Sequence, residues 1–285
     1  MNLREARRIG EEALTEAGIA DVQIDARLLL EHVTGISMTE YALNPFQELK
    51  EEQETVYLDL LGKRKERIPL QHLTGEQEFM GLSFQVNPDV LIPRQDTELL
   101  VLEALKLLKP GMQVLDLCTG SGCIIVSLER IGKERKAADG TNTFTGSDVS
   151  AAAVQTAEAN AGRHGAQVSF VESNLFENLN DRYDMIISNP PYIRTAVIEE
   201  LEEEVRCHDP VLALDGWEDG LYFYRRIIRE AGEYLNPGGL LLFEIGYDQR
   251  EAVAELMEQS GYREICVRKD LAGLDRVVIG RYDIG

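Results

Sequence analysis

The chain has few basic residues for its length. It holds 29 Lys and Arg against 50 Asp and Glu, which gives a formal net charge of −21 over 285 residues. Nucleic-acid-binding proteins gain most of their affinity from Lys and Arg side chains that neutralise phosphates and release counterions. Such an acidic chain is therefore a poor candidate for direct nucleic-acid binding, although a local basic groove is compatible with this charge.

Several other signals are missing. No apolar run approaches the roughly 20 residues that a membrane-spanning helix needs, and the charged start of the chain lacks the apolar stretch of a signal peptide. The four cysteines have no CxxC spacing, and the four histidines are scattered without an HExxH motif. We therefore expect a cytoplasmic protein with reduced cysteines, no membrane association and no metal site.

The first quarter of the chain has a helical pattern. Apolar residues recur with a helical period in three stretches, residues 2–18, 21–35 and about 47–68. Asn2 and Asp21 are expected to cap the first two helices, and Pro69 ends the third. This region shows no phosphate-binding loop, metal-ligand set or basic stripe, so we interpret it as a small helical bundle that serves as a lid or docks a partner.

The pattern changes after this bundle. The short aromatic stretch 79–86 indicates a β-hairpin, and a helix is expected from Asp96, as its cap, to Leu108. Short apolar strands then alternate with amphipathic helices. The strand candidates are residues 114–117, 143–146, 168–171, 185–188, 240–245, 265–268 and 276–280. This alternation predicts an α/β protein with a doubly wound, mostly parallel sheet.

A glycine-containing turn, residues 116–122, joins the first of these strands to a helix. Gly120 and Gly122 have no Cβ, so a ligand can approach the backbone closely there, or the two glycines only form a tight turn. Asp148 closes the next strand and is placed to accept ribose hydroxyls. Dinucleotide enzymes use a related turn, but Ile125 stands where their third glycine would fall. The acidic residues favour S-adenosylmethionine, which carries an ammonium and a sulfonium and no phosphate.

The most specific signal is Asn189-Pro190-Pro191-Tyr192, directly after the strand 185–188. The side-chain oxygen of Asn189 and the carbonyl of Pro190 can each accept one hydrogen of a planar NH₂ group. The ring of Tyr192 can stack on that group. This motif predicts a methyltransferase whose acceptor is a planar, amide-type nitrogen, although a plain Pro-Pro turn after a strand would give the same residues.

Together these motifs resemble the peptide chain release factor N(5)-glutamine methyltransferases. Further matching segments are residues 90–98, 212–216, 219–221, 236–239 and 269–276. The resemblance implies an α/β fold: a class I methyltransferase with a Rossmann-like seven-stranded sheet, a small N-terminal helical domain and a linking β-hairpin. Residues 1–78 would form the partner-docking domain with the start of the linker, and residues 79–285 the hairpin and the methyltransferase domain.

The resemblance also implies a reaction: methylation of the glutamine side chain in the Gly-Gly-Gln motif of class I release factors. The implied contacts to S-adenosylmethionine are Cys118, Thr119, Gly120, Ser121, Gly122, Asp148, Leu175 and Asn189. The implied substrate contacts are Asn189, Pro190, Pro191, Tyr192 and Arg94, with Asn189, Pro190 and Tyr192 catalytic. An ion pair from Arg94 to Asp96 or Glu98 is an equally good account of that arginine.

The chain departs from the family pattern in the cofactor region. Cys118 replaces a usual glycine, and its small side chain would be tolerated there if the backbone φ is negative. Asn174 replaces an acid, and Leu175 replaces a frequent tryptophan. Residues 133–142 lengthen a connection that we expect to be a surface loop.

We call the four residues Asn189–Tyr192 the acceptor motif. Other functions fit this motif as well. A ribosomal-protein glutamine methyltransferase would share it, and so would a nucleic-acid adenine N6- or guanine amino-methyltransferase, which would need base flipping and a positive surface. A third alternative is a non-catalytic binding module that keeps the fold, and failure of the chain to bind cofactor would support it.

Overall fold

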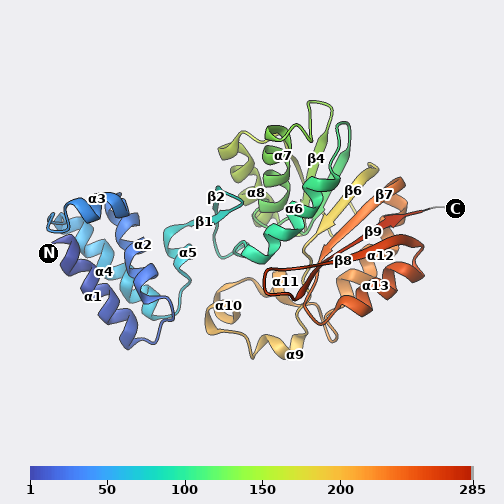
Figure 1. The fold of residues 1–285 in the computed structure, drawn as a ribbon. Coiled ribbons are helices and arrows are strands. Elements are labelled where there is room, and N and C mark those ends of the chain that lie inside the picture. The colour runs from blue at the N-terminus through green and yellow to red at the C-terminus, as the bar shows by residue number, and fades with distance from the viewer. Residues whose placement is uncertain (284–285) are drawn as a thin grey trace. The chain divides into compact units, whose positions relative to one another are not determined.

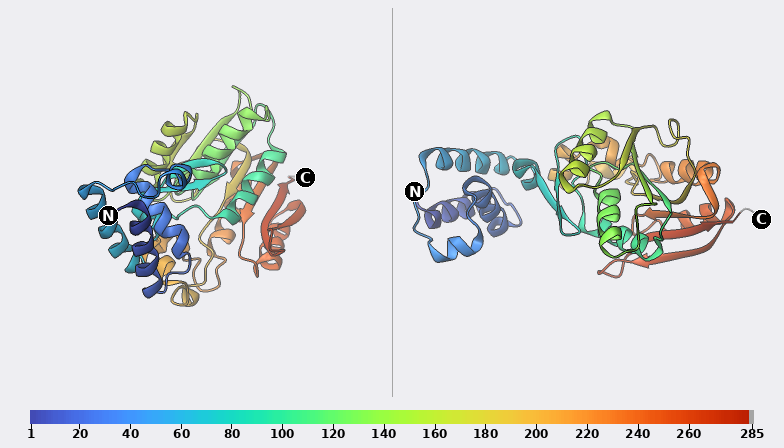
Figure 2. Two further views of the ribbon diagram at one scale, coloured as in Figure 1. Left: turned by 60° about the vertical axis from the view of Figure 1, so that its left-hand side comes forward. Right: turned by 90° about the horizontal axis from the view of Figure 1, so that it is seen from above.

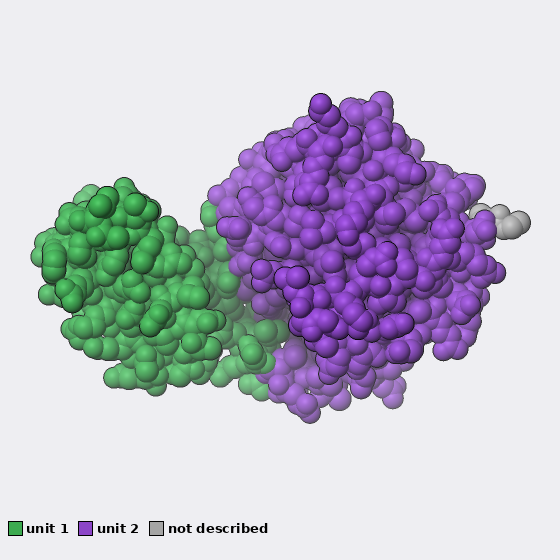
Figure 3. Space-filling view, in the orientation of Figure 1, with its two compact units in different colours: residues 1–76, 202–208 green, residues 77–201, 209–285 purple. Residues whose placement is uncertain are grey.

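The computed structural model describes residues 1–283, which form two compact units (Figures 1 and 3). The first unit comprises residues 1–76 and 202–208, and the second comprises residues 77–201 and the chain from residue 209 onward. The short segment 202–208 therefore packs with the N-terminal bundle, although it comes from the middle of the chain. Nothing in the sequence pattern indicated this.

The first unit is a helical bundle. Its helices are α1 (Leu3–Glu16), α2 (Val22–Thr34), α3 (Met38–Leu43), α4 (Glu51–Lys65), α5 (Leu70–Thr74) and α10 (Glu203–His208). Asn2 caps α1 as expected, in a capping box with Glu5, whereas Asp21 precedes α2 without a side-chain capping bond. The amphipathic pattern missed α3 and α5 because helices of five or six residues are too short to show a period.

A buried charge cluster joins three helices of this bundle. The guanidinium of Arg64 on α4 contacts Asp25 on α2 at 2.7 Å and Glu204 on α10 at 2.8 Å. Arg64 and Asp25 are only 5% and 4% exposed, so each relies on the other for compensation of its charge. This arginine holds segment 202–208 in the first unit.

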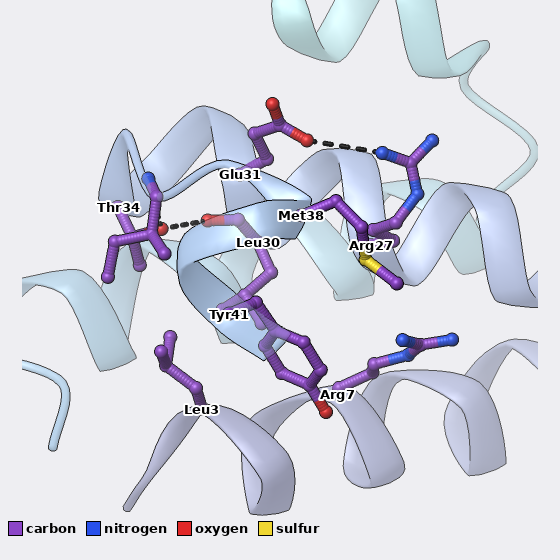
Figure 4. Close-up of a pocket in the computed structure, with 9 residues that line it drawn as sticks. Leu3, Arg7, Arg27, Leu30, Glu31, Thr34, Met38 and Tyr41 are labelled. Carbon is purple, nitrogen blue, oxygen red and sulfur yellow. Dashed lines mark hydrogen bonds and ion pairs between the residues drawn. The ribbon is translucent and has the colours of Figure 1, made fainter. Parts of the chain in front are cut away.

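The bundle also has a small hollow between α1, α2 and α3 (Figure 4). Arg27 pairs with Glu31 at its edge, at 3.2 Å, and the Thr34 hydroxyl donates to the carbonyl of Leu30 at 2.7 Å. The hollow has room for about one water molecule, so it offers no ligand site.

The second unit is built on a seven-stranded sheet with the order β5-β4-β3-β6-β7-β9-β8. The strands are β3 (Gln113–Leu117), β4 (Thr143–Asp148), β5 (Ser169–Glu172), β6 (Tyr183–Ser188), β7 (Leu235–Glu244), β8 (Tyr262–Lys269) and β9 (Asp275–Tyr282). The first five strands of this order are parallel, and β9 runs antiparallel to both β7 and β8. The predicted seven-stranded, mostly parallel sheet is confirmed.

Helices cover both faces of this sheet, because successive strand residues point to opposite sides. On β7, Leu240 and Leu242 belong to one core, with residues of α6 (Glu98–Leu107), α7 (Cys123–Glu134) and α8 (Ala151–His164). Leu241 and Phe243 belong to the other, with residues of α12 (Tyr222–Tyr234) and α13 (Arg250–Gln259). Figures 1 and 2 show the green helices grouped apart from the orange and red ones.

The remaining elements of the second unit are short. They are the hairpin β1 (Glu76–Phe79) and β2 (Leu82–Gln85), the 3₁₀ turn η1 (Gln95–Thr97), α9 (Thr195–Ile198) and α11 (Val211–Leu214). The prediction that Asp96 caps α6 is wrong, because η1 intervenes and α6 begins at Glu98. Across residues 1–283, no helix is long and apolar enough to cross a membrane.

Candidate active site

The glycine turn (residues 116–122) and the acceptor motif (Asn189–Tyr192) follow the ends of two neighbouring strands. β3 and β6 are neighbours, and their last residues, Leu117 and Ser188, are paired in register. The Ser188 hydroxyl also donates to the carbonyl oxygen of Leu117 at 2.8 Å. From β3 the chain builds the sheet in one direction through β4 and β5, and from β6 it builds in the other. The motifs therefore flank the switch point at which open α/β sheets bind ligands.

The glycine turn is fixed to the end of β4. The backbone N–H of Thr119 donates to the carbonyl of Ser147 at 2.9 Å, and that of Gly120 donates to Oδ2 of Asp148 at 2.9 Å. The other carboxylate oxygen accepts from the N–H of Ser150 at 3.0 Å. Burial raises the pKa of Asp148. Each oxygen keeps a lone pair, so the carboxylate can also accept hydroxyl hydrogens of a ligand.

The turn needs left-handed backbone at several positions. Gly120 and Gly122 have φ of +54° and +78°, and a Cβ on Gly122 would lie 3.0 Å from the Cβ of Ala157, where α7 meets α8. Cys118 has φ of +60°, so the negative φ under which a side chain is easily tolerated at this position is not present. A cysteine in this conformation lacks the steric freedom of glycine, and the hydrogen bonds of the turn hold it there.

A second carboxylate lies beneath the turn. Asp116 is fully buried, and its Oδ2 accepts a hydrogen bond from the Thr119 hydroxyl at 2.6 Å. Burial, with a further contribution from the charge of Asp148, raises the pKa of Asp116 to about 7. Asp116 does not line the cavity above it, so it orders the turn from within the protein.

A cavity of about 490 Å³ opens between the two motifs. Its size falls within the range of small-molecule sites in proteins. Among its lining residues are the predicted Arg94, Cys118, Thr119, Gly120, Ser121, Asp148, Leu175, Asn189 and Pro191. Three predicted residues do not line it, namely Gly122, Pro190 and Tyr192. Gly122 packs α7 against α8, and the roles given to Pro190 and Tyr192 toward a substrate stay predictions.

The side chain of Asn189 is oriented by Thr97 and, through Thr97, by Glu244. Its amide nitrogen donates to Oγ1 of Thr97 at 3.3 Å. The Thr97 hydroxyl also bonds the carboxylate of Glu244, whose pKa is raised by burial. A hydroxyl that donates its single hydrogen to a carboxylate can only accept from Asn189. The amide nitrogen of Asn189 therefore points to Thr97, which leaves its side-chain oxygen as the free acceptor.

Tyr192 also contacts Glu244. Its hydroxyl donates to Oε1 of Glu244 at 3.2 Å, and its carbonyl oxygen accepts from Nε2 of Gln249 at 3.0 Å. Burial, followed by the negative charge of Glu244, raises the pKa of Tyr192 above its ordinary value, so the phenol is neutral at pH 7. The tyrosine positions the acceptor motif through both ends of the residue.

Arg276 supplies the positive charge near these groups. It pairs with Asp96 and with Asp270, each at 3.1 Å. Its charge also opposes the effect of burial on the pKa of Glu244. The segments 90–98 and 269–276, distant in sequence, thus meet behind the acceptor motif.

Arg94 lines the cavity, but its ion pair was not predicted. The guanidinium contacts Asp209 at 2.5 Å. The alternative account of Arg94, an ion pair with Asp96 or Glu98, is not found, because Asp96 contacts Arg276 and Glu98 accepts from the backbone N–H of Met80. Asp209 directly follows the segment that packs with the N-terminal bundle.

The sequence interpretation also missed residues of the site. Thr97 lies inside a segment that had been matched without a role, and Glu244 is a single carboxylate within an apolar strand, which is a usable signal for a buried polar function. Arg226 of α12 lines the cavity and donates to Oδ1 of Asn174 at 3.2 Å. That contact gives the asparagine at 174 a defined partner.

The sheet order, the glycine turn after β3, the acid at the end of β4 and the acceptor motif after β6 together define a class I, S-adenosylmethionine-dependent methyltransferase. Asp148, Gly120 and the other lining residues would hold the cofactor. Within residues 1–283, no cluster of His, Cys, Asp and Glu could hold a metal ion. All four cysteines are free thiols.

Comparisons with known proteins identify the family. Residues 5–75 match the PrmC N-terminal domain family, and residues 95–205 match the methyltransferase small domain family. The release factor glutamine methyltransferase of Geobacter sulfurreducens is 43% identical over 269 residues, covering 94% of this chain and 92% of that protein. That of Caulobacter vibrioides is 41% identical over 285 residues, covering 98% and 96%. The chain belongs to the release factor glutamine methyltransferase family.

A solved structure supports the fold. A methyltransferase from Pyrococcus furiosus superimposes with a TM-score of 0.52 at 16% identity, covering 82% of this chain and all of that one. At this identity the likeness concerns the fold alone.

Proposed function

We propose that the chain transfers a methyl group from S-adenosylmethionine to the side-chain nitrogen of the glutamine in the Gly-Gly-Gln motif of class I release factors. The orientation of Asn189 carries this proposal, because a free carboxamide oxygen beside a cofactor-sized cavity suits an acceptor that offers N–H donors. Membership of the release factor glutamine methyltransferase family supports the choice of glutamine over other amide-type acceptors.

The chemistry explains why acceptors are needed. An amide nitrogen is a weak nucleophile, because its lone pair is delocalised into the carbonyl. Hydrogen bonds from the NH₂ group to Asn189 and to the carbonyl of Pro190 would raise the electron density on nitrogen and fix its direction. Positive charge grows on nitrogen as the new bond forms, so these hydrogen bonds strengthen in the transition state.

The cofactor supplies, when bound, a methyl group on a sulfonium and a neutral thioether as the leaving group. The substrate nitrogen would take up this methyl group in place of one of its hydrogens, which would leave as a proton to solvent. The chain's own contribution is orientation and hydrogen bonding, so no residue has to form a covalent bond with the substrate.

The N-terminal bundle is proposed to dock the release factor outside its methylated loop. Such a partner would place the chain in the cytoplasm, in keeping with its four free cysteines. The acidic surface argues against direct binding of nucleic acid.

Methyl transfer tests this assignment. The intact chain with labelled S-adenosylmethionine is expected to label a class I release factor, and to leave unlabelled a release factor whose Gly-Gly-Gln glutamine is replaced by alanine. Equal labelling of both proteins would defeat the proposal. Labelling of a ribosomal protein or of an oligonucleotide in place of the release factor would favour one of the other acceptors.

A further inference from the structure

The chain's single tryptophan stands in an unusual backbone conformation. Trp217 has φ of +70°, a region that bulky residues rarely adopt, and its side chain is 56% exposed. A strained, exposed aromatic residue gains nothing from the core, so its conformation has to be imposed by its surroundings. Such outliers persist where the neighbouring structure fixes them, often at binding sites.

The loop around Trp217 is built on the acceptor motif. The N–H of Trp217 donates to Oδ1 of Asp215 at 2.8 Å, and its carbonyl accepts from the N–H of Thr195 at 3.0 Å. A Cβ on Gly216 would lie 2.7 Å from the backbone of Tyr192, and a Cβ on Gly220 would lie 2.4 Å from the Tyr192 carbonyl oxygen. The two glycines allow the loop to lie directly against the acceptor motif, so Trp217 is held at a fixed place beside it.

Trp217 does not stand alone. Its ring stacks on that of Tyr222, with centroids 4.7 Å apart and planes inclined by 23°. Both rings line the cavity described above and also a neighbouring hollow on the outside. We call these two side chains the aromatic rim. A segment that delivers a side chain from the outer hollow to the acceptor motif has to pass it.

Three of the four charged side chains that line the outer hollow, all except Glu218, have partners among residues 1–283. Arg225 bonds both carboxylate oxygens of Asp219, at 2.8 and 2.9 Å, and Arg194 pairs with Asp248 at 2.6 Å. Recognition at this place therefore depends on the flat apolar faces of the rim more than on an ionic contact.

We infer that the aromatic rim receives the main chain of the glycines that precede the acceptor glutamine in the protein substrate. This inference rests on the proposed function. A peptide group is planar and packs against an aromatic face, and glycine has no Cβ to hold its backbone away from that face. The aromatic rim would thus contact the glycines of the substrate loop, while Asn189 binds the glutamine side chain. The occupant that we propose for the aromatic rim is therefore a glycine-containing loop of a protein.

The single tryptophan makes occupation of the rim observable. Release factor added to the intact chain with S-adenosylhomocysteine is expected to change the tryptophan emission, at the concentrations that saturate methyl transfer. A release factor in which both glycines of the motif are replaced by valine is expected to bind about 10-fold more weakly or worse, as the loss of one aromatic contact would give. No change in emission at saturation would overturn the inference.

Trp217→Gly provides a second test, because glycine suits a φ of +70°. This variant is expected to unfold at the same temperature as the parent or higher, yet to show a KM for the release factor raised about 10-fold, with a smaller effect on kcat. Tyr247→Ala is the control, since Tyr247 is 64% exposed and lines neither hollow.

The outcomes separate the two proposals. A parent chain that labels no release factor would defeat the proposed function, whereas an active parent with an unchanged KM in Trp217→Gly would defeat the inference about the rim alone. Quenching of the tryptophan by an oligonucleotide that competes with the release factor would show a nucleobase on the rim, and would also overturn it.

Discussion

The side-chain nitrogen of Asn189 lies 3.3 Å from the hydroxyl oxygen of Thr97, to which it donates a hydrogen bond. Thr97 is itself bonded to Glu244, a buried carboxylate at the end of β7. Both supporting residues are almost inaccessible to solvent, at 3% and 2% exposure. The orientation of Asn189 is therefore set by the protein before any ligand arrives, so a bound acceptor does not have to order this side chain.

Asn189→Ala removes the free acceptor oxygen. We expect kcat for methyl transfer to the release factor to fall by about 10²-fold or more, by analogy with the loss of one transition-state hydrogen bond in other enzymes. Single-turnover rates with labelled cofactor would measure this, with thermal unfolding as the check that the variant folds. A near-normal rate would remove Asn189 from the mechanism.

Thr97→Val keeps the shape of the side chain and removes its hydroxyl. The amide of Asn189 then loses the group that orients it, and we expect kcat to fall about 10-fold, which corresponds to about 1.4 kcal/mol. Thr97→Ser restores the hydroxyl and is expected to recover most of the rate. If valine and serine gave equal rates, the orienting role of Thr97 would be wrong.

The sequence predicted the sheet and both motifs because each is local. The alternation of apolar residues marks β3 and β6, and the residues that follow each strand carry the chemistry. The residues that orient the acceptor motif could not be predicted in the same way. Thr97, Glu244 and Arg276 come from three separate parts of the chain: β7 and β9 pair as strands, and the turn η1 brings Thr97 to them.

The conformation of Cys118 shows a second limit. The sequence left the backbone conformation of this cysteine open, and the structure gives it a φ of +60°, in a turn that hydrogen bonds attach to β4. Likewise, the ion pair of Arg94 with Asp209 depends on a contact 115 residues away in the sequence, which no local pattern records.

Asp116 gives stability a defined pH dependence. Its pKa is about 7 in the folded chain against 3.8 as the ordinary value, so between these values the folded state binds the proton more tightly than the unfolded state. Stability from this group therefore falls as the pH rises from about 4 to about 7. We expect Asp116→Asn to be more stable than the parent by an amount that grows by about 2 kcal/mol between pH 5 and pH 7.

Denaturant unfolding of both proteins across this pH range measures that difference. Asp148 and Glu244 also have pKa values raised by burial, but they are present in both proteins and largely cancel in the comparison. Parallel stability profiles for parent and variant would contradict the burial of an ionisable Asp116.

Arg64→Met tests the charge cluster of the N-terminal bundle. Asp25 would stay buried without its partner, and we expect the unit to lose about 3–5 kcal/mol of stability, measured by denaturant unfolding of the intact chain. Replacing Asp25 by leucine in the same chain is expected to recover most of this loss. Lys63→Met is the matched control, since the exposed pair of Lys63 with Asp59 contributes less than about 1 kcal/mol.

Gly220 and Gly165 form a matched pair for the loop that supports the acceptor motif. Both have positive φ, +73° and +62°, so alanine costs each about 1–2 kcal/mol of backbone strain. Only at Gly220 would the new Cβ collide, at 2.4 Å, with the carbonyl oxygen of Tyr192, whereas nothing lies within 4 Å at Gly165. We therefore expect both variants to lose a similar amount of stability from backbone strain. Gly220→Ala alone is expected to lose further stability and to show a kcat lower by about 10-fold or more, because the acceptor motif has to shift. Equal kcat values for the two variants would show that the loop does not position Tyr192.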